Sequence, residues 1–405
     1  MTAVAVTGLG LITAAGIGAQ ATWAGVCSGR SAARRDPQLA GLPVDFSCTV
    51  PGFEPAVHVG TRSRLIHDRF VQLALAAARE AVADAGLDPA TWDGARVGVV
   101  VGCGLGGVST WERQQRVMME TGPGAVSALL IPMLVPNMAA GNVAIDLKAT
   151  GPNFVTATAC ASGATALGAA RDLLLAGRCD VVLAGGSEAG VSPLIVTGFA
   201  QMGALSRRRD DPGAASRPFD ADRDGFVIGE GSAILVLERE SDARARGARV
   251  RARFAGYGAS ADAHHLTAPD PQATGVIRAT REALREAELA PEDIDHVNAH
   301  GTSTPLNDEI EASALGTLFG AGPAVTSTKG VLGHTLGAAG AIEAALSVLT
   351  LEHGTVPPTA NLDCQDPKIE LDVVHGRPRH GHLRAAVSNS FGFGGQNAVL
   401  VFTAA

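Results

Sequence analysis

Cys160 is the residue whose surroundings most favour covalent chemistry. It follows an apolar run, 153–155, that predicts the end of a strand, and it precedes a small-residue stretch, 164–175, that predicts a buried helix. Backbone N–H groups and the helix dipole stabilise a thiolate at such a turn, and the small neighbours let a substrate approach closely. A lone cysteine is more often a buried structural residue, so the assignment depends on the rest of the chain.

Three segments in the second half place polar side chains in glycine-rich settings after buried strands. The first holds His300, the second holds Lys329 and His334, and the third is a Ser-Asn-Ser-Phe-Gly-Phe-Gly-Gly run; they span 298–305, 327–340 and 388–395. Each has a plainer interpretation, because a loop histidine is usually structural, a loop lysine is usually solvated, and a Phe-Gly run can be core and turn. Their shared pattern makes them the candidates to act with Cys160.

The elements that must position these side chains alternate between strand and helix. Apolar runs predict strands at 3–10, 96–101, 180–186, 234–237, 250–257, 294–299, 385–391 and 398–402. Helices are predicted at 19–28, 69–85, 121–150, 164–175, 275–287, 308–319 and 340–352, with loops over 36–60. The alternation is typical of a layered α/β architecture. The charged stretch 240–250 favours a division into 1–245 and 246–405, two halves of similar rhythm without a close sequence repeat.

Composition bounds the class of protein. The chain has 405 residues, of which 46% are hydrophobic, so it can bury a large core. Its net charge of −8 argues against broad nucleic-acid binding. Six scattered cysteines form no CxxC pair and no zinc pattern, which favours a reducing cytoplasm. The sequence predicts neither a signal peptide nor a membrane span.

Two short motifs imitate binding sites but lack essential parts. The run 102–107 has the G-x-G-x-x-G spacing after a strand, yet the acidic residue that a dinucleotide site requires is not evident, so a tight turn near a pocket is favoured. Asp220, Asp222 and Asp224 imitate the first half of a calcium loop. Its twelfth position is Gly231 and Glu230 stands one place early, so calcium binding is not predicted.

Taken in order and at their spacing, the motifs resemble those of the β-ketoacyl-[acyl carrier protein] synthases, the elongating condensing enzymes of the thiolase superfamily. The resemblance covers essentially the whole chain and rests on Thr158-Ala159-Cys160, on 217–231, on 298–305, on 333–343 and on 389–395. It implies a thiolase-like five-layer αβαβα fold built from two similar halves, the first supplying Cys160 and the second both histidines.

The resemblance also implies a role for each catalytic residue. Cys160 takes an acyl group from a carrier-protein thioester, and its backbone N–H forms the oxyanion hole with that of Phe393. His300 and His334 hold the malonyl thioester carbonyl while carbon dioxide leaves, and the enolate then attacks the acyl-Cys160 thioester. Lys329 lies near His334, with Glu343 orienting that pair. Phe393 gates the pocket through its mobile glycines.

Substrate and partner contacts follow from the same resemblance. Thr302 and Thr304 bind the phosphopantetheine amides, and Thr267 is placed there by a weaker local match. Three leucines are expected along the acyl tunnel, the last two near a dimer interface: Leu105, Leu129 and Leu130. The expected partner is a separate acyl carrier protein, for which the basic candidates are Arg207, Arg208, Arg209, Arg62 and Arg64. No metal or organic cofactor is expected.

The expected reaction is decarboxylative Claisen condensation, which elongates a fatty acid or polyketide chain by two carbons. Gln396 stands where housekeeping fatty-acid enzymes usually have Thr, which favours a specialised polyketide or polyene role, whereas 298–305 looks more like the fatty-acid type. A chain-length factor lacks the cysteine, a degradative thiolase needs a second catalytic cysteine, and a priming synthase has Asn in place of His334. Homodimer and heterodimer with a chain-length-factor-like subunit both stay open.

Overall fold

A computed structural model describes residues 3–320 and 322–405 of the chain. Its first half contributes these strands to the central sheet: β1 (Val4–Thr13), β2 (Gly16–Ile17), β5 (Val97–Gly102), β6 (Asn153–Thr156), β7 (Val181–Glu188) and β8 (Gly231–Arg239). Its second half contributes β9 (Ala252–Ala261), β10 (His296–Asn298), β11 (Ala324–Thr326), β14 (Ala385–Gly392) and β15 (Gln396–Ala404). Two small ribbons stand apart, β3 (Arg34–Arg35) with β4 (Phe46–Ser47) and β12 (Thr355–Val356) with β13 (Arg379–His380).

The two halves repeat one strand arrangement. The order β6-β5-β7-β8-β1 in the first half corresponds to β11-β10-β14-β15-β9 in the second. In each, three parallel strands are followed by two antiparallel ones. The halves join where β1 pairs with β9, so the two β layers are the two arms of one continuous sheet. The duplication lies in topology, which explains why the sequence has no close repeat.

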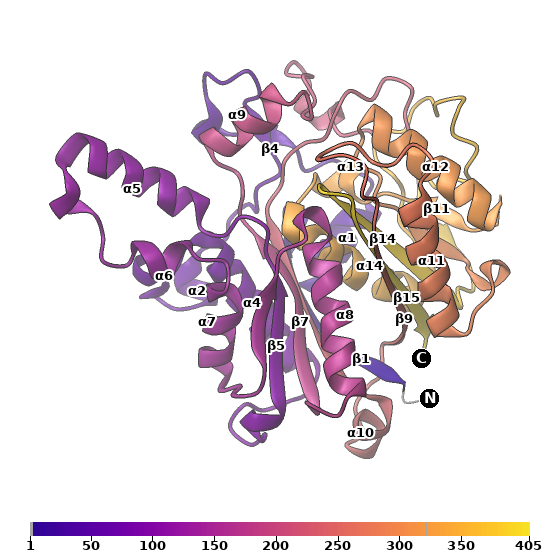
Figure 1. Cartoon of the computed structure of the whole chain (residues 1–405), viewed down its shortest axis with the longest axis horizontal. Helices are drawn as coiled ribbons and strands as arrows, with labels where there is room; N and C mark the ends of the chain where they lie inside the picture. The colour runs from indigo at the N-terminus through magenta and orange to yellow at the C-terminus, as the bar shows by residue number, and fades with distance from the viewer. Residues whose placement is uncertain (1–2, 321) are drawn as a thin grey trace.

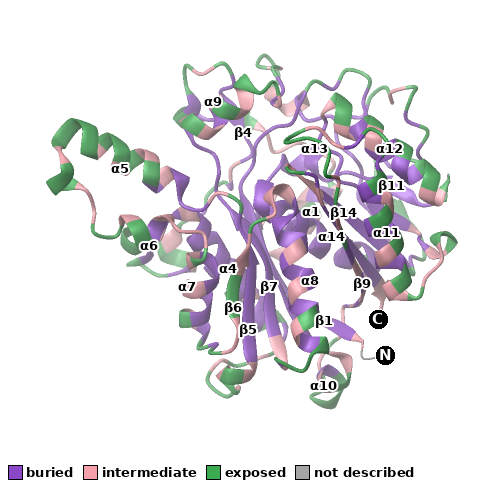
Figure 2. Ribbon diagram, viewed as in Figure 1, coloured by how far each residue is buried: buried purple, intermediate pink, exposed green. Residues whose placement is uncertain are grey.

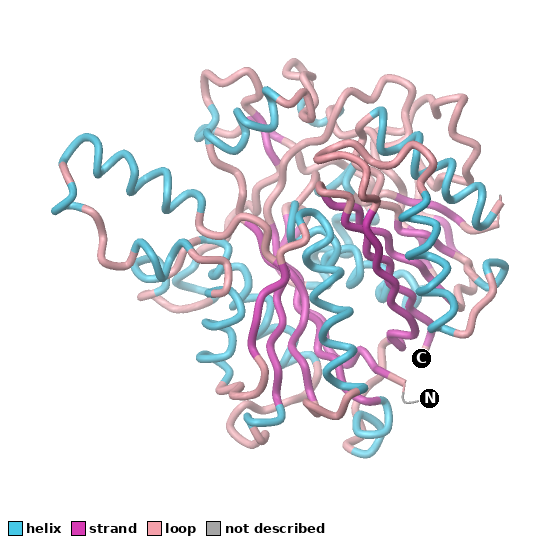
Figure 3. The backbone as a smooth tube through the Cα atoms, in the orientation of Figure 1, coloured by secondary structure: helices cyan, strands magenta, loops and turns pink. Residues whose placement is uncertain are grey.

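Helices complete five layers, which Figure 1 shows from left to right. The outer layer of the first half contains α4 (Arg69–Asp84) and α7 (Met138–Leu147), and that of the second contains α11 (Thr274–Ala287) and α12 (Pro305–Phe319). Between the two arms of the sheet lie α8 (Ser162–Leu175) and α14 (Ala339–His353), as the tube in Figure 3 makes clear for α8. The remaining helices are α1 (Ala19–Cys27), α2 (Pro55–His58), α3 (Ser63–Ile66), α5 (Val108–Thr121), α6 (Leu130–Leu134), α9 (Pro193–Gln201), α10 (Glu240–Ala245) and α13 (Lys329–Leu332).

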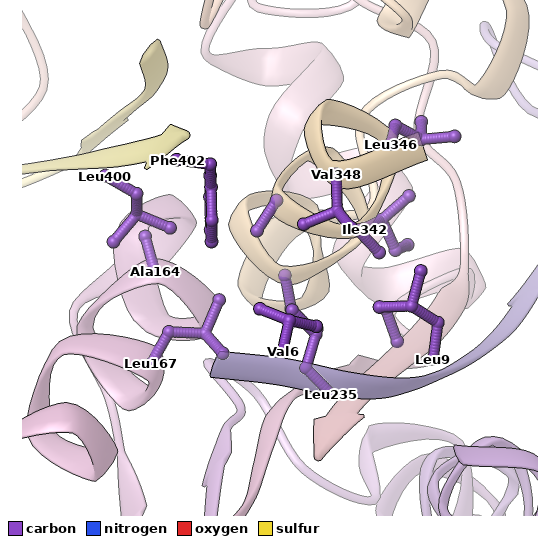
Figure 4. Packing of buried hydrophobic residues seen from close by; sticks show 14 of the residues in the cluster. Val6, Leu9, Ala164, Leu167, Leu235, Ile342, Leu346, Val348, Leu400 and Phe402 are labelled. Atoms are coloured by element: carbon purple, nitrogen blue, oxygen red, sulfur yellow. The ribbon is translucent and has the colours of Figure 1, made fainter. Parts of the chain in front are cut away.

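Three clusters of buried apolar side chains hold these layers together. One lies between α4, α7 and the first arm of the sheet, and another lies between α11, α12 and the second arm. The third fills the centre, where side chains of β1, β8 and β15 meet those of α8 and α14 (Figure 4). Phe402 and Leu346 are fully buried there. Burial of a side chain of that size stabilises the fold by about 1.5–3 kcal/mol, so the central helices are firmly seated.

An arm made of α5 and α6 projects from the first half (Figure 1) and is mostly exposed (Figure 2). The sequence predicts a helix over 121–150, but in the structure α5 ends at residue 121 and is followed by the short α6 and then by α7. Pro123 and Pro136 interrupt the predicted stretch, because proline removes a backbone donor. The arm exposes large apolar side chains, among them Met119 at 74% and Ile131 at 60%.

Most other predicted elements are present within a few residues of their expected bounds. Residues 36–60 form mainly loops, as expected, with short elements at 37–39, 46–47 and 55–58. Within the described part of the chain, no helix has the length and apolarity that a bilayer crossing requires.

Candidate active site

The nucleophile turn between β6 and α8 holds Cys160 in a constrained backbone. Ala159, the residue before it, has a left-handed φ of 50°, which is unfavourable for a residue with a side chain. Ser162 supports this turn, since its Oγ accepts from the Thr158 N–H at 2.9 Å and donates to the Ala159 carbonyl at 2.6 Å. The thiol is therefore held at the start of α8, where the sequence predicts a helix N-terminus.

Two glycines bring the cysteine helix against the segment that follows the second histidine. A Cβ on Gly163 would lie 2.7 Å from the backbone nitrogen of Ala341, and a Cβ on Gly340 would lie 2.8 Å from that of Ala164. Only residues without a side chain allow α8 and α14 to cross this closely. The crossing places the nucleophile of the first half beside the histidines of the second.

The two histidines and the thiol lie together in one cavity of about 250 Å³. His334 Nε2 is 3.0 Å from Cys160 Sγ, and the ring centroids of His300 and His334 are 5.5 Å apart. The Nδ1 atom of each ring is buried and lacks a hydrogen-bond partner among the described residues. The contacts therefore fix neither tautomer.

Lys329 is not a solvated loop residue, because only 1% of its surface is exposed. Its Nζ forms an ion pair with Glu343 and donates to the His300 carbonyl at 2.6 Å. Burial raises the pKa of Glu343 to about 7, although the lysine acts in the opposite direction. The buried pair thus ties α13 and α14 to the loop that carries His300.

Electrostatics corrects the expectation of a stabilised thiolate. Although the cysteine keeps some exposed surface, desolvation of its sulfur raises the pKa of Cys160 to about 11, against the lowering effects of Lys329 and the Phe393 N–H. Burial also lowers the pKa of His300 and His334 well below the usual value, and Lys329 adds to this effect. At neutral pH the resting site is therefore a thiol beside two neutral imidazoles.

The Phe393 loop approaches the nucleophile closely. Its backbone N–H points at the Cys160 sulfur. A Cβ on Gly392 would lie 2.4 Å from the Thr158 carbonyl oxygen and 3.3 Å from the Cys160 nitrogen, so glycine is required there. Gly394 and Gly395 follow with left-handed φ values of 83° and 70°.

The cavity brings together some of the residues predicted to contact substrate. Thr302, Thr304, Thr267 and Phe393 line it beside the thiol and the histidines. Leu105 does not line it and instead packs in the apolar cluster that contains Leu336.

Two further predicted tunnel residues lie on the projecting arm. Leu129 is exposed and immediately precedes α6, and Leu130 is the first residue of that helix. Neither of them lines the cavity at Cys160.

The basic residues predicted to dock a carrier protein differ in their exposure and in their contacts with neighbouring groups. Arg207 is exposed, Arg208 donates to the Asp222 carbonyl at 3.1 Å, and Arg209 pairs with Asp45 at 3.2 Å. This run follows the cavity-lining segment 202–204 by a few residues. The exposed side chains of Arg62 and Arg64 belong to the α3 region.

The aspartates of the calcium-like motif make structural contacts. Asp220 accepts from the Arg217 guanidinium at 2.9 Å and from the backbone of residues 363 and 364. Asp224 accepts from the backbone N–H of Arg207. Across residues 3–320 and 322–405, no cluster of three or more His, Cys, Asp or Glu side chains is arranged to hold a metal ion.

Sequence reasoning missed one buried carboxylate at the site. Glu311 of α12 accepts the backbone N–H groups of His300 and Gly301 at 2.8 and 2.7 Å, and the Asn389 side chain at 3.1 Å. It holds the first histidine loop against the third glycine-rich segment. Glu311 stands in an acidic helix start, after Asp308 and Glu309, and its donors lie mainly on the backbone of another segment, so no sequence pattern marks it.

Comparisons with known proteins agree with this geometry. The beta-ketoacyl synthase N-terminal domain matches residues 1–243 and the C-terminal domain matches residues 251–363. The 3-oxoacyl-[acyl-carrier-protein] synthase 2 of Synechocystis sp. is 43% identical over 406 residues, covering 98% of this chain and 97% of that protein. The protein of the same name from Staphylococcus aureus is 41% identical over 404 residues, with coverage of 98% and 97%.

Solved structures extend the likeness to the whole fold. A chain of the ishigamide ketosynthase/chain length factor has a TM-score of 0.94 and 36% identity, covering 100% of this chain and 99% of its own. Since the family description, the relatives and the folded structure agree over nearly the full length, the chain belongs to the β-ketoacyl synthase family.

Proposed function

We propose that this condensing enzyme forms an acyl thioester on Cys160 and extends it by decarboxylative condensation with a malonyl group held on an acyl carrier protein. The product is a fatty acid or polyketide chain longer by two carbons. The observation that carries the proposal is the 3.0 Å contact between His334 Nε2 and Cys160 Sγ, with His300 in the same cavity. The names of the relatives, 3-oxoacyl-[acyl-carrier-protein] synthase 2, support the same reaction class.

Acyl transfer comes first. The resting thiol has a pKa of about 11, so its proton must leave during attack, and His334 Nε2 is placed to accept it. Sulfur then bonds to the acyl carbon, the oxyanion is held by the Cys160 and Phe393 N–H groups, and the phosphopantetheine thiolate leaves with that proton. A single donor of this kind lowers the activation free energy by about 3–4 kcal/mol.

Condensation follows on the acylated enzyme. The malonyl thioester carbonyl accepts from the Nε2–H groups of His300 and His334 while carbon dioxide departs, so the electron pair of the broken bond forms an enolate. For this step His334 takes the opposite neutral tautomer to the one that accepted the thiol proton. The enolate carbon attacks the acyl carbon, the bond to Cys160 sulfur breaks, and the departing thiolate takes up one proton from solvent, which restores the thiol. Neutral imidazoles suit this role, because an added charge is costly in a buried site.

The remaining contacts serve binding and support. Thr302, Thr304 and Thr267 line the cavity and carry hydroxyl groups suited to phosphopantetheine amides. Lys329 and Glu343 hold the His300 loop through its carbonyl. The proposed division into 1–245 and 246–405 separates the nucleophile from the two histidines.

We propose a carrier-protein docking surface formed by the basic candidates already named. Its strongest support is the exposed Arg207, which lies close in sequence to the cavity segment 202–204. One solved structure similar to this chain, AntDE:AntF, is an acyl-carrier protein in complex with its ketosynthase. Docking of an acidic carrier weakens with added salt.

A dimer is the second part of this proposal. The exposed apolar arm, which carries Leu129 and Leu130, favours burial against a second chain, and this contact would complete the acyl tunnel. Similar structures are described as ketosynthase with chain length factor, which favours a heterodimer as the alternative to a homodimer. A cytoplasmic location is proposed from the scattered free cysteines.

Intact-mass analysis of acyl loading tests the first half-reaction. The purified protein is incubated with a panel of acyl carrier proteins, alone and with a candidate partner subunit. Expected is an added acyl mass that is absent in Cys160→Ala. The absence of an adduct in both settings, from a folded protein, would overturn the assignment of the nucleophile.

A further inference from the structure

Glu188, at the end of β7, is a fully buried carboxylate that the proposed chemistry does not use. It receives hydrogen bonds from two segments that are distant in sequence. Its donors are the backbone N–H groups of Gly104 at 2.7 Å, Leu105 and Gly337 at 3.2 Å, Gly106 at 3.3 Å, and the Cys103 thiol at 3.3 Å. The glycine-rich turn 102–107 therefore encloses a carboxylate of its own chain.

The two segments carry leucines at the edge of the cavity. Leu336, next to Gly337, lines the cavity with Cys160, and Leu105 packs in the same apolar cluster. A Cβ built on Gly190 would lie 2.9 Å from Cδ1 of Leu105 and 2.9 Å from Cδ1 of Leu336. The tips of both leucines thus converge over Gly190, two residues after Glu188.

We propose that Glu188 is a positioning residue that sets the spacing of Leu105 and Leu336 and thereby selects the length of the acyl chain. This inference rests on the proposed acyl transfer to Cys160. A carboxylate is suited to the task because it only accepts hydrogen bonds, so one group can draw backbone donors of both segments to a single point. The leucines then form a wall between the cavity and the rest of the apolar cluster in which they pack.

The proximity of this wall to the nucleophile supports the inference. A Cβ on Gly104 would lie 3.8 Å from the carbonyl oxygen of Ala159, which precedes the catalytic cysteine. The charge of Glu188 also reaches the sulfur, since it raises the pKa of Cys160. An acyl chain attached to Cys160 therefore starts close to the turn that Glu188 holds.

Glu188→Gln tests the inference, with Glu80→Gln as the matched control. The amide places an NH₂ donor against backbone donors, so the two segments separate and the leucine wall opens. Glu80 also accepts two backbone N–H groups, those of Leu11 and Ala19 at 2.9 and 2.7 Å, but it does not line the cavity. Each variant is loaded with acyl carrier proteins of increasing chain length, and initial rates are read by intact mass.

The expected result is a shift of the preferred substrate toward longer acyl chains in Glu188→Gln and no shift in the control variant Glu80→Gln. The rate ratio between the preferred chain and one two carbons longer should change by about tenfold, as one or two methylenes in an apolar pocket allow. Leu105→Ala should give a similar shift, and the double variant should show no further change, because both act on one wall.

An unchanged length profile in Glu188→Gln, with all rates scaled equally, would overturn the inference while leaving acyl transfer intact. Failure of the unmodified enzyme to load any chain would instead overturn the proposed function. If Glu188→Gln does not fold, Glu188→Asp serves in its place, since it keeps the charge but shortens the reach; its profile must shift for the inference to stand.

Discussion

Lys329 and Glu343 form a buried ion pair whose members cannot be replaced at equal cost. Glu343→Leu leaves a buried ammonium with only the His300 carbonyl as acceptor. Removing one partner of such a pair costs about 3–5 kcal/mol of unfolding free energy. Lys329→Met leaves a carboxyl that can take up a proton, because burial raises the pKa of Glu343 to about 7 even beside the lysine. At about pH 6 we expect this variant to lose only its hydrogen bonds, about 1–3 kcal/mol.

The two variants should respond to pH in opposite directions. In Lys329→Met the pKa of Glu343 rises further, because the lysine that lowers this pKa in the unmodified protein is absent. When folding raises the pKa of a carboxyl, its contribution to stability is complete at pH values below the unfolded pKa of about 4.3. That contribution is lost as the pH rises through the folded pKa. In the unmodified protein this loss of stability ends near pH 7, whereas in Lys329→Met it continues above pH 7. Above pH 7 the destabilisation of Lys329→Met relative to the unmodified protein therefore grows by up to about 1.4 kcal/mol per pH unit.

Glu343→Leu should show the reverse. This variant has no carboxyl at position 343, so it lacks the loss of stability that the raised pKa of Glu343 causes in the unmodified protein as pH rises to about 7. Its penalty relative to the unmodified protein therefore shrinks as pH rises through that range. Urea unfolding of both variants at about pH 6 and about pH 9 measures the two slopes, and the double variant, which has neither group, is the control. Slopes of the same sign would refute the buried-pair reasoning.

Three further predictions concern catalysis and docking. Because burial lowers the pKa of His300 and His334 well below the usual value, the condensation rate should show no inflection near pH 6.5; a clear inflection there would contradict neutral histidines. Gly392→Ala forces a methyl group against the nucleophile turn, so kcat should fall about 10²–10³-fold, and near-normal turnover would argue against the oxyanion hole. Arg207→Glu should raise the KM for the carrier protein, and the increase should be larger at low salt than at high salt. Arg209→Glu should also lower the melting temperature, because it places a negative charge against Asp45 in place of an ion pair. An unchanged KM in Arg207→Glu would exclude that residue from docking.

The strands could be predicted because long apolar runs dominate them. The run 97–102 is buried along its full length, as expected for a central strand. The helix α5 could not be predicted in the same way. It is a mostly exposed, polar helix on a projecting arm, and only Val108 and Thr110 are buried within it. Its composition is polar, and its larger apolar side chains, among them Met118 and Met119, are exposed instead of packed on the sheet, so it lacks the apolar character that marks a core helix.

The candidate site was predictable in its residues but not in its electrostatics. Cys160, His300 and His334 lie in recognisable segments, and the structure brings them into one cavity. The direction of the thiol pKa shift was wrong, because desolvation of the sulfur outweighs the nearby N–H group and lysine. The roles of Glu188 and Glu311 depend on backbone donors from segments far away in sequence, so composition and spacing cannot reveal them.

Condensation itself gives the most direct test of the central proposal. Acyl-loaded enzyme, freed of excess acyl carrier, is mixed with malonyl carrier protein, and the carrier is analysed by intact mass. The account predicts a β-ketoacyl carrier protein, one carbon dioxide released for each product, and a free Cys160 thiol. His300→Ala and His334→Ala should each keep the fold but lose this product. A stable acyl enzyme that never transfers its chain, with any malonyl carrier and with a partner subunit present, would contradict the proposal.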